Sequence, residues 1–328
     1  MAVVTKTLKT SGGDYSSQVT WESTEQTNLV TDGDSHILEV GTSGSFESFT
    51  GNFTISGWTT SATNNITIRA VAGAEHNGVP QGGSGQGSRF YSTNNVCDMS
   101  AVDIVIEDME METNGTSVTG IRHLSGSGKE AYIERCIVGR SGTSGGEYSI
   151  RFNSSGVGSV RNCLVIDHST SAKSDGIYYE AVGTGVCENN TVNVNNNYGV
   201  KTTNTNVTAK NVVSLGDTTN DWSGTFNASS TNNASGDSTA KGSSPVTGVV
   251  LTDGTDFTEP STGDYSPVAS GALDGAGDNS VGGNDIAGVA HNDPPEIGCY
   301  ALAAAGGGLS IPQIIAMTRK PNTPLITM

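Results

Sequence analysis

The chain has 328 residues, with 44 glycines, 6% aromatic residues, 15% charged residues and a formal net charge of −17. This acidic balance excludes the basic surface that nucleic-acid binding needs. No run of about 18 apolar residues is present, so no membrane-spanning helix is predicted. Residues 1–17 lack the apolar core of a secretion signal, and five scattered cysteines are typical of reduced thiols. We therefore expect a protein made and assembled in a cytoplasm.

Short β-branched runs separated by Gly, Asn, Ser and Thr predict many short strands. Residues 1–13 are predicted to form a flexible N-terminal arm. Residues 14–90 are predicted to form a cap and the first coils, with one or two helical turns within 16–30. A stacked β-structure needs such a non-repeating cap, because an exposed end would template aggregation.

The central part of the chain, residues 97–216, repeats itself. "IERCIVGR" (133–140) and "VRNCLVID" (160–167) follow the same pattern, with Cys136 and Cys163 at the same place in the phrase. The same step leads back from Cys136 to Met109 and on from Cys163 to Asn190, and a shorter step leads to Asn211. These positions form one column of equivalent residues: Met109, Cys136, Cys163, Asn190 and Asn211. A second strand recurs at a similar distance after the first four, at Ile121, Ile150, Ile177 and Val200.

A period of about 21–27 residues with several short strands and Gly or Asn corners predicts an all-β solenoid, a parallel β-helix. A leucine-rich repeat has a similar period, but its helical and Leu-x-x-Leu segments are missing. A β-sandwich would not explain the constant step between the repeated phrases.

In this fold Asn190 and Asn211 are expected to stack as an amide ladder, and Cys136 and Cys163 to be small buried fillers. Stacked side chains point the same way, which disfavours a disulfide between them. A neighbouring column is expected on the outer surface, where coils pair through charges. Its members are Glu107, Glu134, Arg161 and Glu188.

The C-terminal third is less periodic. Residues 217–302 are predicted to form irregular coils, residues 303–308 a glycine hinge, and residues 309–328 an apolar and basic interaction arm. The competing interpretation of the last segment is a disordered terminus. As an arm it would bind another subunit by strand addition or groove filling, through Leu309, Ile311, Pro312, Ile314, Ile315, Met317, Arg319, Lys320, Leu325 and Ile326.

Two stretches carry a resemblance. "DYSSQVTWESTEQTNLVTDGDSHILEV" and "FTISGWTTSATNNITIRAVAGAEHNG" resemble the N-terminal part of phage- and prophage-associated, pectate-lyase-like, right-handed parallel β-helix proteins. Residues 266–302 resemble the closing coil of such proteins. The resemblance implies a right-handed single-stranded parallel β-helix over 14–302.

With the missing signal and the terminal arm, the resemblance favours a non-enzymatic virion structural protein on the particle surface. It would decorate the capsid or form an appendage, with capsid or tail subunits as partners. Two alternatives from other classes are a tailspike-like polysaccharide depolymerase and a host-surface adhesin. Host polysaccharide as a ligand and a homo-oligomer both stay open.

A depolymerase would need paired carboxylates or a calcium cluster. The candidate acids are Glu107, Asp108, Glu110, Glu112, Asp167, Asp175 and Glu180. Tyr178 and Tyr179 are the best candidate platform for sugars. In parallel coils, however, residues one period apart lie about 5 Å from each other, so acid pairs arise by chance. The five histidines share no metal-binding spacing, and no metal or cofactor is expected.

Overall fold

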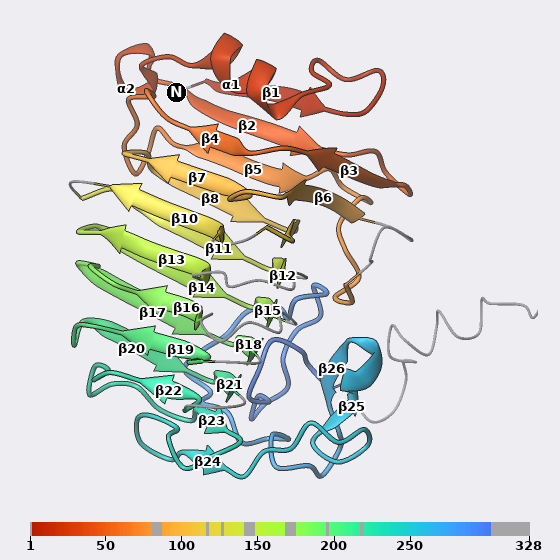
Figure 1. The fold of residues 1–328 in the computed structure, drawn as a ribbon, viewed down its shortest axis with the longest axis vertical. Helices are drawn as coiled ribbons and strands as arrows, with labels where there is room; N and C mark the ends of the chain where they lie inside the picture. The colour runs from red at the N-terminus through yellow and green to blue at the C-terminus, as the bar shows by residue number, and fades with distance from the viewer. Residues whose placement is uncertain are drawn as a thin grey trace, which may run out of the picture.

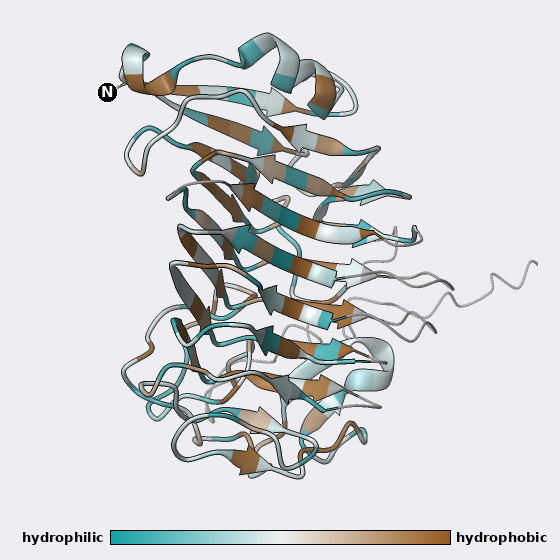
Figure 2. Cartoon of the chain, turned by 60° about the vertical axis from the view of Figure 1, so that its left-hand side comes forward, coloured by the Kyte–Doolittle hydropathy of each residue, from teal (hydrophilic) through white to brown (hydrophobic). Residues whose placement is uncertain are grey.

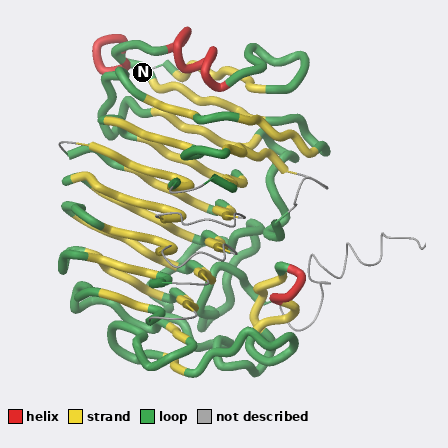
Figure 3. Tube along the Cα trace, viewed as in Figure 1, coloured by secondary structure: helices red, strands yellow, loops and turns green. Residues whose placement is uncertain are grey.

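In the computed structural model the chain winds into a stack of coils, and the central coils each contribute one short strand to each of three parallel sheets (Figure 1). The structure describes residues 2–80, 87–115, 118–125, 128–140, 148–167, 175–194, 197–216 and 220–302. Helix is confined to α1 (Gln18–Glu25), α2 (Leu29–Asp32) and a short 3₁₀ turn, Pro260–Thr262, in these residues (Figure 3). The expected all-β parallel β-helix is confirmed.

Sheet 1 has eight strands, and its neighbours pair in parallel along the stack. They are β1 (Val3–Leu8), β2 (Ser35–Val40), β5 (Ile66–Ala70), β8 (Ile104–Glu107), β11 (Ala131–Glu134), β14 (Val157–Arg161), β17 (Thr184–Glu188) and β20 (Val207–Lys210).

Sheet 2 has nine strands. They are β3 (Phe46–Thr50), β6 (Gly87–Ser92), β9 (Glu110–Thr113), β12 (Ile137–Arg140), β15 (Leu164–Asp167), β18 (Thr191–Val194), β21 (Val213–Gly216), β23 (Ala234–Ser235) and β24 (Val246–Thr247).

Sheet 3 has seven strands. They are β4 (Phe53–Ile55), β7 (Cys97–Ser100), β10 (Thr119–Ser125), β13 (Tyr148–Ser154), β16 (Asp175–Tyr179), β19 (Val200–Thr202) and β22 (Trp222–Ser223). Outside the three sheets, β25 (Phe257–Glu259) and β26 (Asp264–Pro267) form a small antiparallel pair.

The core is a column of apolar side chains enclosed by the three sheets. Residues alternate between inward apolar and outward polar positions along most strands, as Figure 2 shows by hydropathy. The predicted second-strand column is one of the inward rows, because Ile121 pairs with Ile150, Ile150 with Ile177, and Ile177 with Val200. All four side chains are fully buried.

The N-terminal end is closed by helix and strand together. Trp21 of α1 lies over the first coil, with its ring 5.8 Å from that of Phe53 and 5.6 Å from that of Trp58. The predicted flexible arm at 1–13 is wrong, because β1 pairs with β2 over its whole length. The physical reason is that the edge of β2 carries backbone groups that need hydrogen-bond partners.

The predicted column of equivalent positions holds for four of its five members. Glu188 pairs with Lys210, and Thr191 pairs with Val213. The step between these two coils is therefore one residue longer than the step from Asn190 to Asn211. The equivalent of Asn190 is therefore Val212, and Asn211 is the equivalent of Asn189. The amide ladder between Asn190 and Asn211 is wrong.

Asn211 instead belongs to a column of corner residues that all have a left-handed backbone. Their φ values lie between 48° and 60°, a region in which asparagine is the most tolerated residue with a side chain. The members of this corner column are Asp108, Arg135, Asn162, Asn189, Asn211 and Asn232.

Irregular coils were predicted over 217–302, and β22, β23 and β24 do extend the sheets, but the part after β24 does not form coils. After β24, residues 250–302, which we call the C-terminal strap, run back along the outer face of sheet 2 (Figure 1). Phe257, Tyr265, Leu273, Ile286 and Ile297 of the strap form one buried cluster with outward residues of sheet 2. The sheet residues in that cluster include Ile137, Leu164, Ile166, Val213 and Leu215. The resemblance of 266–302 to a closing coil therefore does not describe its position.

The strap also follows the corner column. The Asn232 side chain donates to the Ala276 carbonyl at 2.8 Å. The Asn211 side chain accepts from the Asp278 backbone N–H at 2.6 Å and donates to the Asp278 carbonyl at 3.2 Å. The asparagines that permit the corner thus also bind the strap.

Candidate functional site

The candidate acids do not converge on one site. Glu107 and Asp108 lie at the corner that ends β8, whereas Glu110 and Glu112 lie on β9 in sheet 2. Asp175 begins β16 in sheet 3, and Glu180 follows that strand. Asp167 ends β15, and its side chain lies outside the described residues. The acids are therefore distributed over three surfaces.

Most of these acids are held by a cation. Arg135 contacts Asp108 at 2.7 Å and Glu107 at 3.1 Å. Similar contacts join Glu112 to Arg89 at 2.6 Å, Asp175 to Lys201 at 3.0 Å and Glu180 to Arg151 at 2.6 Å. Glu110 is buried and lies in the same row of sheet 2 as Ile137. A carboxylate that is already hydrogen-bonded to a cation is a poor nucleophile and a poor general base.

Sheet 3 carries a stack of aromatic and cationic side chains on its outer face. The rings of Tyr148 and Tyr178 are stacked with centroids 4.9 Å apart. The Arg151 guanidinium lies over the Tyr148 ring at 5.0 Å, and the Lys201 ammonium lies over the Tyr178 ring at 4.7 Å. The cations engage the ring faces that a sugar would need for stacking.

The predicted sugar platform of Tyr178 and Tyr179 is therefore wrong. Adjacent residues of a strand point to opposite faces, and Tyr179 is fully buried in the core, where it stacks on Phe152 at 5.2 Å. Asp175 lies beside the outer stack and is buried. Burial raises the pKa of its carboxyl, although the contact with Lys201 opposes the rise.

Sheet 1 carries the predicted charge pairing. Glu107, Glu134, Arg161 and Glu188 follow each other in register on neighbouring strands. Arg161 contacts Glu188 at 2.9 Å, and nearer the N-terminus Arg69 contacts Glu39 at 2.8 Å. These pairs join successive coils, so the charged residues on this face have a structural role.

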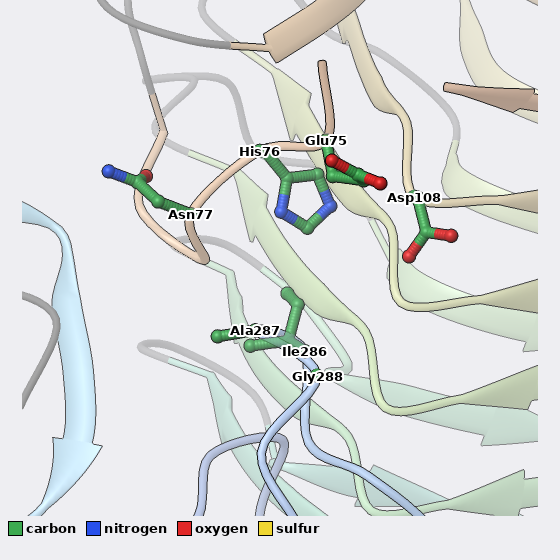
Figure 4. A pocket seen from close by; sticks show the side chains of 7 residues that line it. All are labelled: Glu75, His76, Asn77, Asp108, Ile286, Ala287 and Gly288. Carbon is green, nitrogen blue, oxygen red and sulfur yellow. The ribbon is translucent and has the colours of Figure 1, made fainter. Parts of the chain in front are cut away.

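One cavity lies where the strap meets the corner between sheets 1 and 2 (Figure 4). Its volume is about 370 Å³. It is lined by Glu75, His76 and Asn77 of the loop after β5, by Asp108, and by Ile286, Ala287 and Gly288 of the strap. In Figure 4 the His76 ring lies above Ile286 and Ala287 of the strap, and Asp108 lies to one side.

His76 is buried and bonded on both ring nitrogens. Nε2 lies 2.7 Å from the Arg135 carbonyl, and Nδ1 accepts from the Gly78 backbone N–H at 3.2 Å. Because Nδ1 is the acceptor, the ring is neutral with its proton on Nε2. Burial lowers the pKa of His76, which favours this neutral form.

The other histidines are dispersed. His36 lies under the N-terminal cap, His123 is buried between sheets, and His291 contacts Glu296 within the strap at 3.3 Å. His168 lies outside the described residues. Among the residues that the structure describes, no three His, Cys, Asp or Glu side chains are grouped so that they could bind a metal ion.

The predicted interaction arm cannot be placed. Residues 303–308 and 309–328, with all ten residues named for that arm, lie outside the described residues. The strap before them is fixed up to Leu302, whose carbonyl accepts from the Asn292 side chain at 3.2 Å. In the described ranges, no helix has the length and hydropathy that crossing a bilayer requires.

Sequence reasoning missed the strap and the cavity that it closes. A signal was present in the repeated phrases, where outward and inward positions are both apolar, as in Ile137–Val138 and Leu164–Val165. A strand that is apolar on both faces is covered on both faces. Comparison with protein-family models, curated proteins and solved structures found no match.

Proposed function

We propose that this chain is a non-enzymatic structural protein of a bacteriophage particle, exposed on its surface as a capsid decoration or appendage. One observation carries the non-enzymatic part. Glu107, Asp108, Glu112, Asp175 and Glu180 each lie within 3.1 Å of an arginine or lysine nitrogen. Retaining or inverting hydrolysis would require two carboxylates free to act on one bond.

The form of the body supports a structural role. Parallel strands pair from coil to coil along three sheets, so few backbone groups are accessible to proteases. On the outer face of sheet 1, ion pairs join successive coils, and on that of sheet 3 stacked rings do the same. The strap covers much of the outer face of sheet 2. This arrangement suits a rigid module on a particle.

The attachment is proposed to reside in residues 309–328. Their apolar residues, together with Arg319 and Lys320, differ from the acidic remainder of the chain. Burial of the six Leu and Ile side chains of this segment against a capsid or tail subunit would contribute about 1.5–3 kcal/mol for each side chain, before the cost of ordering.

Deletion of 309–328 tests the proposal. The truncated chain should keep its β-sheet circular dichroism and its cooperative unfolding, and lose cosedimentation with particles. A matched variant, Arg319→Ala with Lys320→Ala, separates the charge contribution from the apolar one. Particle binding that survives the deletion, or release of reducing sugar or unsaturated uronate from host polysaccharide, would contradict the proposal.

A further inference from the structure

The upper end of the strap is attached to the loop that carries His76. The Tyr300 hydroxyl donates to the Gly78 carbonyl, a contact between residues separated by more than two hundred positions in sequence. Gly78 has a φ of +83°, and a Cβ there would lie 3.1 Å from the Tyr300 ring and 3.4 Å from Ile286. The strap thus packs directly against the backbone of this loop.

His76 fixes the conformation of the same loop. It connects Gly78 to the corner of the coil stack, because its ring bonds both the Gly78 N–H and the Arg135 carbonyl. Protonation of Nδ1 would remove the acceptor and place a second N–H against that of Gly78. The loop would then lose the contact that positions the Gly78 carbonyl for Tyr300.

The groups that face His76 come from three elements. Glu75 lies on its own loop, and Asp108 and Arg135 lie on two successive corners. The strap presents Ile286 and Ala287, beside the titratable Asp285, and its Tyr300 hydroxyl contacts the Gly78 carbonyl of the same loop. Burial opposes protonation of the ring most strongly, and the positive charge of Arg135 also opposes it, whereas the hydrogen bond to the Arg135 carbonyl and the charge of Asp108 favour it. Arg135 is itself held by Asp108 and Glu107, so it stays in place.

The ring is also accessible to protons without unfolding of the body. His76 forms part of the wall of the cavity of about 370 Å³ between loop and strap (Figure 4). Water in this cavity would lie beside the buried His76 side chain.

We propose that His76 is an acid-sensitive latch that holds the upper part of the strap, residues 285–302, on the β-helix at neutral pH and releases it on mild acidification. Release would uncover apolar residues of sheet 2 that share a buried cluster with the strap, such as Ile137 and Leu164. The proposal does not depend on the function proposed above.

The direction of the pH effect follows from the linkage between protonation of His76 and release of the strap. His76 is neutral in the closed state with a lowered pKa, and in the released state it titrates near its ordinary value of about 6.5. Acid therefore favours the released state. The ratio of released to closed molecules should rise up to about tenfold for each pH unit below that value, with a slope of one proton.

Hydrogen–deuterium exchange of the full chain between pH 7.5 and 5.0 tests this, after correction for intrinsic exchange rates. Peptides covering 285–302 should lose protection by up to about tenfold per pH unit below about 6.5, while peptides of α1 and β4 stay protected. In His76→Gln, a neutral side chain that can both donate and accept, the loss should disappear. A wild-type profile without pH dependence, or the same loss in His76→Gln, would overturn the proposal.

Two further variants keep the test decisive. His291→Gln changes the histidine of the strap itself, whose partner is Glu296, and this variant should keep the wild-type response. Tyr300→Phe removes the hydroxyl contact but leaves His76, so protection should fall at every pH with the slope unchanged. If His76→Gln does not fold, loss of the pH dependence in His291→Gln would still show that His76 is not the sensor.

Discussion

The Asn190 side chain accepts a hydrogen bond from the backbone N–H of Cys163 at 2.9 Å and so completes the corner of the preceding coil. Its amide also donates to the Val160 carbonyl at 2.8 Å. One coil earlier, Cys163 Sγ contacts the Cys136 N–H at 3.4 Å and the Ile133 carbonyl at 3.5 Å. Cysteine and asparagine thus perform the same task in this column, and Cys163 is more than an apolar filler.

Asn190→Ala should lower the free energy of unfolding by about 2–3 kcal/mol, because it leaves a buried N–H and a buried carbonyl without partners. Asn190→Cys should cost less, since Cys163 already makes the equivalent contacts. Urea unfolding followed by circular dichroism measures both. Equal losses in the two variants would show that the hydrogen bonds contribute little.

The five cysteines should be unreactive in the native protein. Cys97, Cys136, Cys163, Cys187 and Cys299 are free and buried, and burial raises the pKa of Cys187 to about 12. A thiol reagent at pH 8 should therefore modify none of them before unfolding and five afterwards. Cys136→Ala and Cys163→Ala should each cost about 1–2 kcal/mol of stability. Rapid modification of any thiol in the native state would contradict this packing.

Gly78→Ala should destabilise the strap more than a backbone effect alone explains. Gly248 has nearly the same φ, +80°, but no atom within 4 Å of a Cβ there. Gly248→Ala should therefore cost only the left-handed strain of about 1–2 kcal/mol, whereas Gly78→Ala must also displace Tyr300. The difference should appear in urea unfolding and in exchange of residues 285–302. Equal effects of the two variants would show that Tyr300 of the strap does not pack against Gly78.

Glu296 should contribute stability that depends on pH. Burial alone would raise the pKa of this carboxyl, but hydrogen bonds from His291 and Asn292 hold that pKa below its ordinary value of 4.5. The contribution is therefore complete above pH 4.5 and is lost as the pH falls through the lowered value. Glu296→Gln should lower stability at pH 7 by about 1–3 kcal/mol and flatten the acid limb.

Urea unfolding at several pH values checks this prediction. His291→Gln is the matched control, because it removes the partner and leaves the carboxylate. In this variant the free energy of unfolding should depend on pH as in the wild type at pH values above 4.5, the ordinary pKa of Glu296. The pH range in which Glu296 acts is therefore separate from that of His76. An acid limb identical in wild type and Glu296→Gln would show that Glu296 is not involved.

The regular coils were predictable because they repeat. Each coil buries its apolar residues only against its neighbours, so a constant step along the chain fixes which side chains stack. The error at Asn211 arose where this step shortens and two asparagines, Asn189 and Asn190, are adjacent. One of them requires a left-handed corner and the other an inward position, which sequence alone did not separate.

The strap was not predictable by the same reasoning, because it has no period and its contacts are with residues far away in sequence. Asn211 binds Asp278, and Gly78 binds Tyr300. The cavity beside His76 exists only through these long-range contacts. The acids were found from the sequence, but their cations, such as Arg135 for Asp108 and Lys201 for Asp175, are set by the coil register.

Electron microscopy of purified particles, combined with mass spectrometry of their proteins, tests the central functional claim most directly. The chain should copurify with the particle and appear as a three-sided rod of stacked coils on its outer surface. Particles that assemble in cells expressing the chain but contain none of it would contradict the account.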